Sequence, residues 1–323
     1  MSTEPSPASS PSVVGNRLED LNEAQFAYLM LTPLFLLLGT MAFWPLARTF
    51  EMSLHADAAF NSGLVGEFVG FENFVQILSG QRSAYFSNPV IDLSKPFRSS
   101  LTVTLLFTLG AVVLETVVGF GQALVLNESF RGRRWVRVAL IIPWAVPIVI
   151  QGIIFFLMFS PGVGLLLDPL QSLGLISDAP LASSQDSLLI LIVSDVWRQS
   201  AFMTLLILAG LQSIDRDLYK VARVSGASRW QRFKTITFPL VFPALLIALL
   251  FRTIGAMKVF GPVVTITNCN TVPTLSCMVV NSWQNNRIGS SSTIAFVLAL
   301  IIAVLLVVYL VVLFRSDQGE EGI

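Results

Sequence analysis

The sequence predicts an all-α protein that crosses a membrane six times. Apolar residues make up 54% of the 323-residue chain and charged residues only 12%, about half the ~25% that is usual in soluble domains. The apolar residues gather in runs of about 20, the length that crosses a bilayer as a helix. These two observations exclude a soluble protein with a large core.

Six runs are long enough for a membrane-spanning helix. The first, third and sixth carry no charge over their centres, whereas the other three contain ionisable side chains. The predicted spans are residues 26–47, 99–126, 138–160, 187–212, 238–260 and 291–314. Together they form one transmembrane domain over residues 25–315.

The segments outside these runs are more polar. Residues 1–24, rich in Ser and Pro and without the pattern of a signal peptide, are predicted to be a disordered tail. Residues 316–323 form a second short tail. The largest extramembrane piece, 48–98, is predicted to be an outer loop that can fold as a small cap.

The basic residues indicate which loops face the cytoplasm. Ten of the 20 Lys and Arg residues lie in two short loops, at 131, 133, 134, 137, 216, 220, 223, 229, 232 and 234. The loop 161–186 has none, and the loop 261–289 has only Arg287. We therefore expect a multi-pass protein of the cytoplasmic (inner) membrane with both termini in the cytoplasm.

Composition also excludes several functions. The 20 basic residues are balanced by 20 acidic ones, which leaves no electrostatic footprint for nucleic acid. Two Cys and one His cannot supply a four-ligand zinc site or an iron–sulfur cluster, so we expect no bound metal. A Gly-x-x-x-x-Gly-Lys-Ser/Thr phosphate loop is absent, so we expect no ATP hydrolysis by this chain.

The cytoplasmic loop 213–239 predicts two short amphipathic helices. Ser213 or Asp215 can cap the first helix, and Gly226 permits a left-handed turn after it. The second helix begins near Ser228 and leads to the next span at Pro239. The helical spacing i, i+3, i+4, i+7 places four residues on one face of the first helix: Leu218, Val221, Ala222 and Ser225.

Two such helices outside the bilayer need a surface to dock on. They can lie on the membrane as a basic surface helix. Alternatively, they can insert into a groove of a cytoplasmic partner. Composition leaves both alternatives open.

The motif in this loop favours a protein partner. It resembles the loop of binding-protein-dependent ABC importer permeases, which reads Glu-Ala-Ala, three residues, Gly, nine residues, Ile, one residue, Leu-Pro. The spacing is complete here, with matches at Ala222, Gly226, Ile236 and Pro239 and departures at Lys220, Val221 and Phe238.

The resemblance extends over about residues 26–314. Residues 68–74, Phe-Val-Gly-Phe-Glu-Asn-Phe, look like the Phe-Val-Gly-Leu-Glu-Asn-Tyr after the first span of sugar-type permeases. Residues 130–133 and 142–147 resemble that subfamily's second cytoplasmic loop and third span. The chain is thus similar to carbohydrate importer permeases of the maltose and glycerol-3-phosphate type, with a type I ABC importer permease (MetI-like) fold.

The resemblance implies a transport subunit that works by alternating access and is not an enzyme. The implied partners are a second homologous permease forming a heterodimer, two ATPase subunits, and an extracytoplasmic solute-binding protein that delivers a mono-, di- or oligosaccharide. ATP and Mg would be bound by the ATPases, with no cofactor on this chain. Residues 215–226 would be the coupling helix, with Leu218 on its docking face.

Lys220 stands where the family carries a Glu. Either the ATPase groove has a compensating acid, or this permease couples through shape alone. A third alternative is that the second permease of the heterodimer carries the Glu that is usual at this position in the family.

Polar side chains inside the spans are candidates for the solute path. Asp195 and Arg198 can pair at i, i+3. Such a pair either neutralises itself and holds helices together, or lines the path beside an aromatic ring and an amide suited to a sugar. The candidates are Gln151, Asp195, Trp197, Arg198, Gln199 and Arg252.

Other intramembrane polar groups are expected to be structural. Glu115 is predicted to contact another helix, and Arg252 to be paired or to face water. Gln122 and Gln151 are each expected to bond a neighbouring helix. Related permeases often have Phe-Asp after the fifth span, where this chain has Phe260 followed by Gly.

Cys269 and Cys277 lie in the last outer loop, which faces an oxidising compartment. A disulfide between them is plausible, and two free thiols are the alternative.

Two other functional classes compete. An ion-gradient-driven secondary transporter or channel would show an internal repeat or an ionisable relay across several spans. The sequence has neither, and that class gives no role to residues 213–239. An intramembrane enzyme is disfavoured because the single His lies outside the predicted spans.

Overall fold

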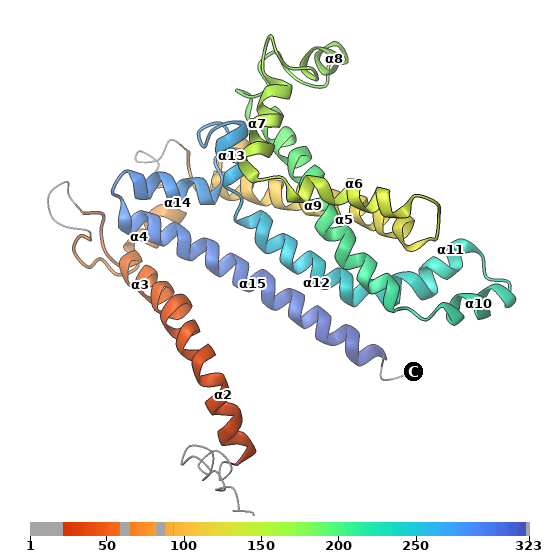
Figure 1. The fold of residues 1–323 in the computed structure, drawn as a ribbon. Helices are drawn as coiled ribbons and strands as arrows, with labels where there is room; N and C mark the ends of the chain where they lie inside the picture. The colour runs from red at the N-terminus through yellow and green to blue at the C-terminus, as the bar shows by residue number, and fades with distance from the viewer. Residues whose placement is uncertain (1–21, 59–64, 82–87, 93, 321–323) are drawn as a thin grey trace, which may run out of the picture. The chain divides into compact units, whose positions relative to one another are not determined.

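The computed structural model describes residues 22–58, 65–81, 88–92 and 94–320 (Figure 1). Every regular element among these residues is a helix, and the one β-type contact is an isolated bridge between His55 and Phe68. The predicted all-α class is therefore confirmed. The chain divides into two compact units, one ending at Glu51 and one starting at Met52.

The first unit is an apolar helix. It consists of α2 (Glu23–Leu38), a π-helical turn (Gly39–Phe43) and α3 (Trp44–Ser53). The whole stretch Glu23–Ser53 is long and apolar enough to cross a membrane, and its apolar window has no buried residue. The predicted tail lies mostly outside the described residues, and the helix already begins at Glu23, inside the range predicted for that tail.

The second unit contains the remaining helices. They are α4 (Glu72–Leu78), a 3-10 turn (Pro96–Arg98), α5 (Ser100–Asn127), α6 (Arg133–Ala145), α7 (Ile148–Phe159), α8 (Leu167–Ser172), α9 (Ser184–Ser213), α10 (Arg216–Val224), α11 (Arg229–Arg232), a π-helical turn (Phe233–Thr237), α12 (Phe238–Met257), α13 (Gly261–Ile266), α14 (Leu275–Gln284) and α15 (Ile288–Glu320).

Within the described ranges, five helical stretches are long and apolar enough to cross a membrane. They are Glu23–Ser53, Ser100–Asn127, Ser184–Ser213, Arg229–Met257 and Ile288–Arg315. A sixth crossing is available if the bent pair α6 and α7 counts as one span.

The third predicted span is not one straight helix. Helices α6 and α7 meet at an angle of 93°. Val146 has an extended conformation (ψ 128°) between them, because a residue that precedes a proline, here Pro147, is driven out of the helical region. The predicted span 138–160 therefore contains a break at Val146 that the sequence analysis did not predict.

Two other predicted boundaries also shift. The fifth span ends at Met257, and the predicted outer loop after it contains the short helices α13 and α14. The backbone of α15 stays helical to Glu320, through most of the predicted C-terminal tail. The predicted cap over 48–98 includes α4, which packs on α15 through Phe74 and Phe296, with ring centroids 6.4 Å apart.

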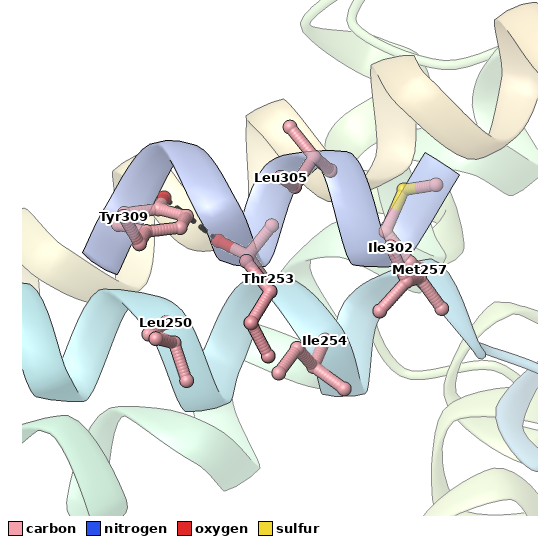
Figure 2. A pocket seen from close by; sticks show the side chains of 8 residues that line it. Leu250, Thr253, Ile254, Met257, Ile302, Leu305 and Tyr309 are labelled. Carbon is pink, nitrogen blue, oxygen red and sulfur yellow. Dashed lines mark hydrogen bonds between the residues drawn. The ribbon is translucent and has the colours of Figure 1, made fainter. Parts of the chain in front are cut away.

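Helix α12 packs along α15 (Figure 1). Figure 2 shows the apolar groove between them, with one polar contact drawn across it: the hydroxyls of Thr253 and Tyr309 lie 3.0 Å apart. The groove is lined by Leu250, Thr253, Ile254, Met257, Ile302, Leu305, Leu306 and Tyr309. Its apolar lining makes it a helix-packing surface and not a site for a hydroxylated solute.

Helices α5 and α9 pack closely against each other along their length. A Cβ on Gly119 would lie 2.6 Å from the Cβ of Met203 and 3.2 Å from the carbonyl oxygen of Ser200. The missing side chain lets the two backbones come together, as small residues do in membrane helix pairs. Near this contact, the Thr204 hydroxyl donates to the Gln122 amide oxygen at 2.6 Å, the interhelical bond expected of Gln122.

A buried ionic network joins α5, α9 and α12. The Arg252 guanidinium donates from Nε and Nη2 to the Glu115 carboxylate, the second bond measuring 2.8 Å, and from Nη2 to Asp195 at 2.9 Å. The Glu115 side chain is 0% exposed, and those of Arg252 and Asp195 are 6% and 7% exposed. The expectations that Glu115 contacts another helix and that Arg252 is paired are confirmed.

The close approach of α5 and α9 yields a first prediction. Gly119→Leu should lower the stability of the purified protein by about 1–3 kcal/mol, because the added side chain has no room against α9. Gly121→Leu is the matched control, since a Cβ there meets nothing within 4 Å in the same helix. Thermal unfolding in detergent measures both. Equal effects of the two substitutions would contradict the role given to Gly119.

The ionic network yields a second prediction. Arg252→Met should destabilise the protein by about 3–5 kcal/mol, because two carboxylates stay buried without their cation. Adding Glu115→Gln and Asp195→Asn should recover part of the loss. Lys220→Met is the control: it breaks an exposed pair with Asp217 and should cost at most about 1 kcal/mol. Arg252→Met with wild-type thermal stability would refute the network's structural role.

Candidate functional site

The α10–α11 segment begins with a capped helix. The Asp215 carboxylate accepts from the backbone N–H of Asp217 at 2.9 Å, at the N-cap of α10. Asp217 in the first turn and Arg223 in the last turn both suit the helix dipole. Of the two capping residues that the sequence allowed, the structure uses Asp215.

Gly226 makes the turn between α10 and α11. Its φ is +82°, and the N–H of Ala227 reaches back to the carbonyl oxygen of Ala222 at 2.9 Å. A Cβ at Gly226 would meet nothing within 4 Å. The backbone conformation, and not crowding within this chain, therefore requires glycine here.

Ser228 begins the second helix, as predicted. Its side chain accepts from the N–H of Gln231 while the Gln231 side chain accepts from the N–H of Ser228 at 2.7 Å, which is a complete capping box. Helix α11 continues without a break into α12. It passes through the π-helical turn, where the N–H of Phe238 bonds to the carbonyl of Phe233, and Pro239 lies in the first turn of α12.

Several contacts fix this segment to the membrane helices. The Tyr219 hydroxyl lies 3.1 Å from the Thr237 hydroxyl and so joins α10 to the start of α12. The Phe233 ring stacks on Trp230 at 5.5 Å and meets Phe120 of α5 edge-on at 5.8 Å. Ile236 packs against the buried cluster between α5, α9 and α12. The base of the segment is therefore held by three elements.

The outer face of α10 is apolar and exposed. Leu218, Val221 and Val224 are 45%, 65% and 90% exposed, whereas Ala222 is half-buried. Val224 extends the face predicted from Leu218 and Val221; no sequence signal indicated it, because it stands at an unspecified position of the family motif. Lys220 pairs with Asp217 of its own helix, with Nζ 2.7 Å from Oδ1.

A polar cavity lies beside the ionic network. It has a volume of about 150 Å³ and is lined by Ile148, Asp195, Arg198, Gln199, Arg252, Gly255, Lys258, Val259, Phe260, Gly261 and Pro262. Four of the predicted path residues thus share one cavity: Asp195, Arg198, Gln199 and Arg252. The short break between α12 and α13 supplies Lys258, Val259 and Phe260 to the lining of the cavity.

The two other predicted path residues are not among those that line this cavity. Gln151 is fully buried, and its Nε2 donates to the carbonyl oxygen of Ser194 at 2.8 Å, which joins α7 to α9 as expected. The Trp197 ring lies against Phe155, with centroids 5.8 Å apart.

The predicted local pair of Asp195 and Arg198 does not form. Asp195 bonds instead to Arg252, which comes from a different helix and reaches two carboxylates at once. The Nε of Arg198 is shielded from solvent and donates to no acceptor among the described residues. Lys258 is a further cavity cation that no sequence signal indicated, because it lies near the end of the predicted fifth span and belongs to no family motif.

The break after α12 is held from two sides. The Thr274 hydroxyl donates to the carbonyl oxygen of Val259 at 3.1 Å, and the Thr104 hydroxyl of α5 accepts from the N–H of Leu275 at 2.9 Å. Cys269 and Cys277 are joined in a disulfide, with their Cα atoms 5.5 Å apart. This bridge closes the connection between α13 and α14. No group of His, Cys, Asp or Glu within the described ranges could hold a metal ion.

The chain is similar to transport proteins in both sequence and fold. It is 36% identical over 286 residues to the trehalose/maltose transport system permease protein of Thermococcus litoralis, covering 86% of this chain and 91% of that one. It is 36% identical over 241 residues to the sulfoquinovosyl glycerol transport system permease protein of Agrobacterium fabrum, covering 75% and 73%. It is 30% identical over 283 residues to the sn-glycerol-3-phosphate transport system permease protein of the same organism, covering 85% and 89%.

A solved structure shares the fold. A chain of a bacterial ABC transporter involved in the import of the acidic polysaccharide alginate superposes with a TM-score of 0.68, covering 95% of this chain and 99% of that one at 21% identity. The predicted ABC importer permease fold is thereby confirmed. Residues 115–319 match the family described as binding-protein-dependent transport system inner membrane component. The chain therefore belongs to this family and is a multi-pass membrane permease subunit.

Proposed function

We propose that this chain is the transmembrane subunit of an ATP-driven importer that moves a carbohydrate delivered by an extracytoplasmic solute-binding protein. The observation that carries the proposal is the α10–α11 segment, an exposed apolar helix fixed at its base to the membrane helices. The named substrates of the relatives, which are sugars or glycerol derivatives, support the substrate class.

The geometry of the segment supports coupling to a partner ATPase. Leu218, Val221 and Val224 form the docking face of α10, and the open space around Gly226 leaves room for a partner surface. Closure of the ATPase pair on ATP would move α10. The Tyr219–Thr237 contact and the Phe233 ring would then pass the movement to α12 and α5. The spans would rock between states open to either side of the membrane.

The remaining partners and the topology follow from the same proposal. A second, homologous permease completes the solute path, and the ATPases bind ATP and Mg while this chain binds no cofactor. Both termini and the α10–α11 segment face the cytoplasm. Lys220 is already paired with Asp217, which supports docking by shape more than by an acidic partner in the ATPase groove.

The alternative of an ion-gradient-driven transporter has less support. Such a transporter needs ionisable groups in series across the membrane. Glu115, Arg252 and Asp195 instead form one closed network between three helices.

Reconstitution tests the proposal. The chain should be assembled with its sister permease, ATPase subunits and binding protein in proteoliposomes, and ATP-dependent uptake of trehalose, maltose, sulfoquinovosyl glycerol and glycerol 3-phosphate measured. We expect uptake of at least one of these solutes, and no ATPase activity from the purified chain alone. Uptake that follows an ion gradient without ATP, or ATPase activity of this subunit by itself, would show that the assignment is wrong.

Gly226 offers a test of coupling. Gly226→Leu should lower ATP-dependent uptake by about tenfold or more, because a side chain strains the left-handed turn by roughly 1–2 kcal/mol and projects toward the partner surface. Gly226→Asn, which tolerates this conformation better, should retain more activity.

Gly132 provides the matched control for that test. It also has a positive φ, +92°, and open space around its Cβ position, but it lies in the loop before α6. Gly132→Leu should therefore carry similar strain with a smaller loss of uptake. Retention of the ATPase on purification measures docking directly. Wild-type uptake by Gly226→Leu would instead favour a helix that lies on the membrane surface.

A further inference from the structure

We propose that the cavity beside the ionic network binds an acidic group of the solute, so that the transported carbohydrate is an anion bearing a sulfonate, carboxylate or phosphate. This inference rests on the proposed function and narrows its substrate class. The charged side chains that line the cavity, apart from the Arg252–Glu115 ion pair, support it.

The internal pairs leave an excess of positive charge. Arg252 is neutralised by Glu115, whose carboxylate is fully buried and accepts from both Nε and Nη2. The ionisable residues that remain on the wall are Asp195, Arg198 and Lys258. Two cations therefore face one carboxylate, and that carboxylate already accepts from Arg252. The cavity and its network together carry one positive charge in excess.

Among the cavity residues that the structure describes, Arg198 has a buried donor without an acceptor. Its Nε–H is shielded from solvent and has no acceptor among the described residues, and no carboxylate oxygen of that part of the chain lies within 4.0 Å of its guanidinium. A buried donor without an acceptor is costly. A sulfonate, carboxylate or phosphate presents two oxygens in the spacing that the guanidinium fork binds.

Two glycines open the same wall. Arg252 Nη1 makes none of the network's bonds, and it lies 3.1 Å from where a Cβ of Gly255 would be. Gly255 and Gly261 both line the cavity. The missing side chain at Gly255 leaves Nη1 of Arg252 without a Cβ packed against it, and the missing side chain at Gly261 makes room for Ile148.

A neutral sugar would leave the excess charge in place. Its hydroxyls can bond to Asp195 and Gln199, but they carry no charge to offset Arg198 and Lys258. Arg198 is half-buried at the cavity and Lys258 is exposed beside it, and ionisable side chains within membrane spans mark functional sites. The volume of about 150 Å³ is about ten times the ~10–15 Å³ that holds one water molecule, enough for an acidic group with part of a sugar ring.

Gly261 allows a test that changes only the charge. Gly261→Asp places a carboxylate on the cavity wall, and Gly261→Asn places an amide of the same shape. Both meet the Cγ2 atom of Ile148, 2.8 Å from the Cβ position, so their comparison cancels the steric effect. The complete complex in proteoliposomes should show uptake of the acidic probe at least about tenfold lower with Asp than with Asn.

The probes form a matched pair. Sulfoquinovosyl glycerol and glucosyl glycerol differ in a sulfonate that replaces the hydroxyl at carbon 6, and glycerol 3-phosphate and trehalose extend the comparison. Binding of each probe to the isolated binding protein is measured by calorimetry, which separates delivery from passage through the membrane. We expect uptake of an acidic probe, a large loss with Arg198→Gln, and a smaller loss with Arg198→Lys.

The outcomes separate this inference from the proposed function. ATP-dependent uptake of only the neutral probes overturns the anionic substrate and leaves the importer intact. Equal uptake of the acidic probe by the Asp and Asn variants at position 261 also overturns it. Uptake of no probe, with an assembled and ATP-hydrolysing complex, overturns the proposed function together with the inference.

Discussion

The arrangement of the membrane helices depends on the position of one guanidinium group. Arg252 of α12 binds the carboxylates of Glu115 on α5 and Asp195 on α9, and all three side chains are almost entirely buried. In a medium that solvates charge poorly, each of these groups needs the others. The helices α5, α9 and α12 are therefore held in the one relative position in which each of these buried charges has a partner of opposite sign. The same requirement fixes one wall of the cavity, because Asp195 and Arg252 belong to both.

The same three helices connect the cavity with the α10–α11 segment. Between the ionic network and that segment, α5 and α9 touch at Gly119, and the buried cluster below includes residues of α5, α9 and α12. From the segment side, Ile236 packs on this cluster and Phe233 reaches it through the ring of Phe120. Because such packed interiors deform little, a displacement of α10 has to be accommodated by movement of whole helices.

Much of this arrangement could be predicted from the sequence. The apolar runs indicated the long helices, and Asp215, Gly226 and Ser228 indicated the two-helix segment because their caps and turns are local. The bend between α6 and α7 also had a local signal, since Pro143 and Pro147 interrupt an apolar run. No local sequence signal indicated the partner of Asp195. The spacing along the helix predicted Arg198, whereas the actual partner, Arg252, comes from a helix distant in the sequence. Lys258 was missed because its role depends on the break that follows α12.

The break between α12 and α13 allows residues of the cavity lining to change without a change in the packing of the membrane-spanning helices. Lys258, Val259 and Phe260 lie between α12 and α13, and their backbone is held by Thr274 and by the connection that the Cys269–Cys277 disulfide closes. The ionic network, which holds the helices, contributes Asp195 and Arg252 to the same cavity. A change of charge at position 258 therefore alters the charge of the cavity wall while the ionic network between the helices stays the same. The charge of the cavity wall thus varies with Lys258, whereas the packing of the helices depends on the ionic network.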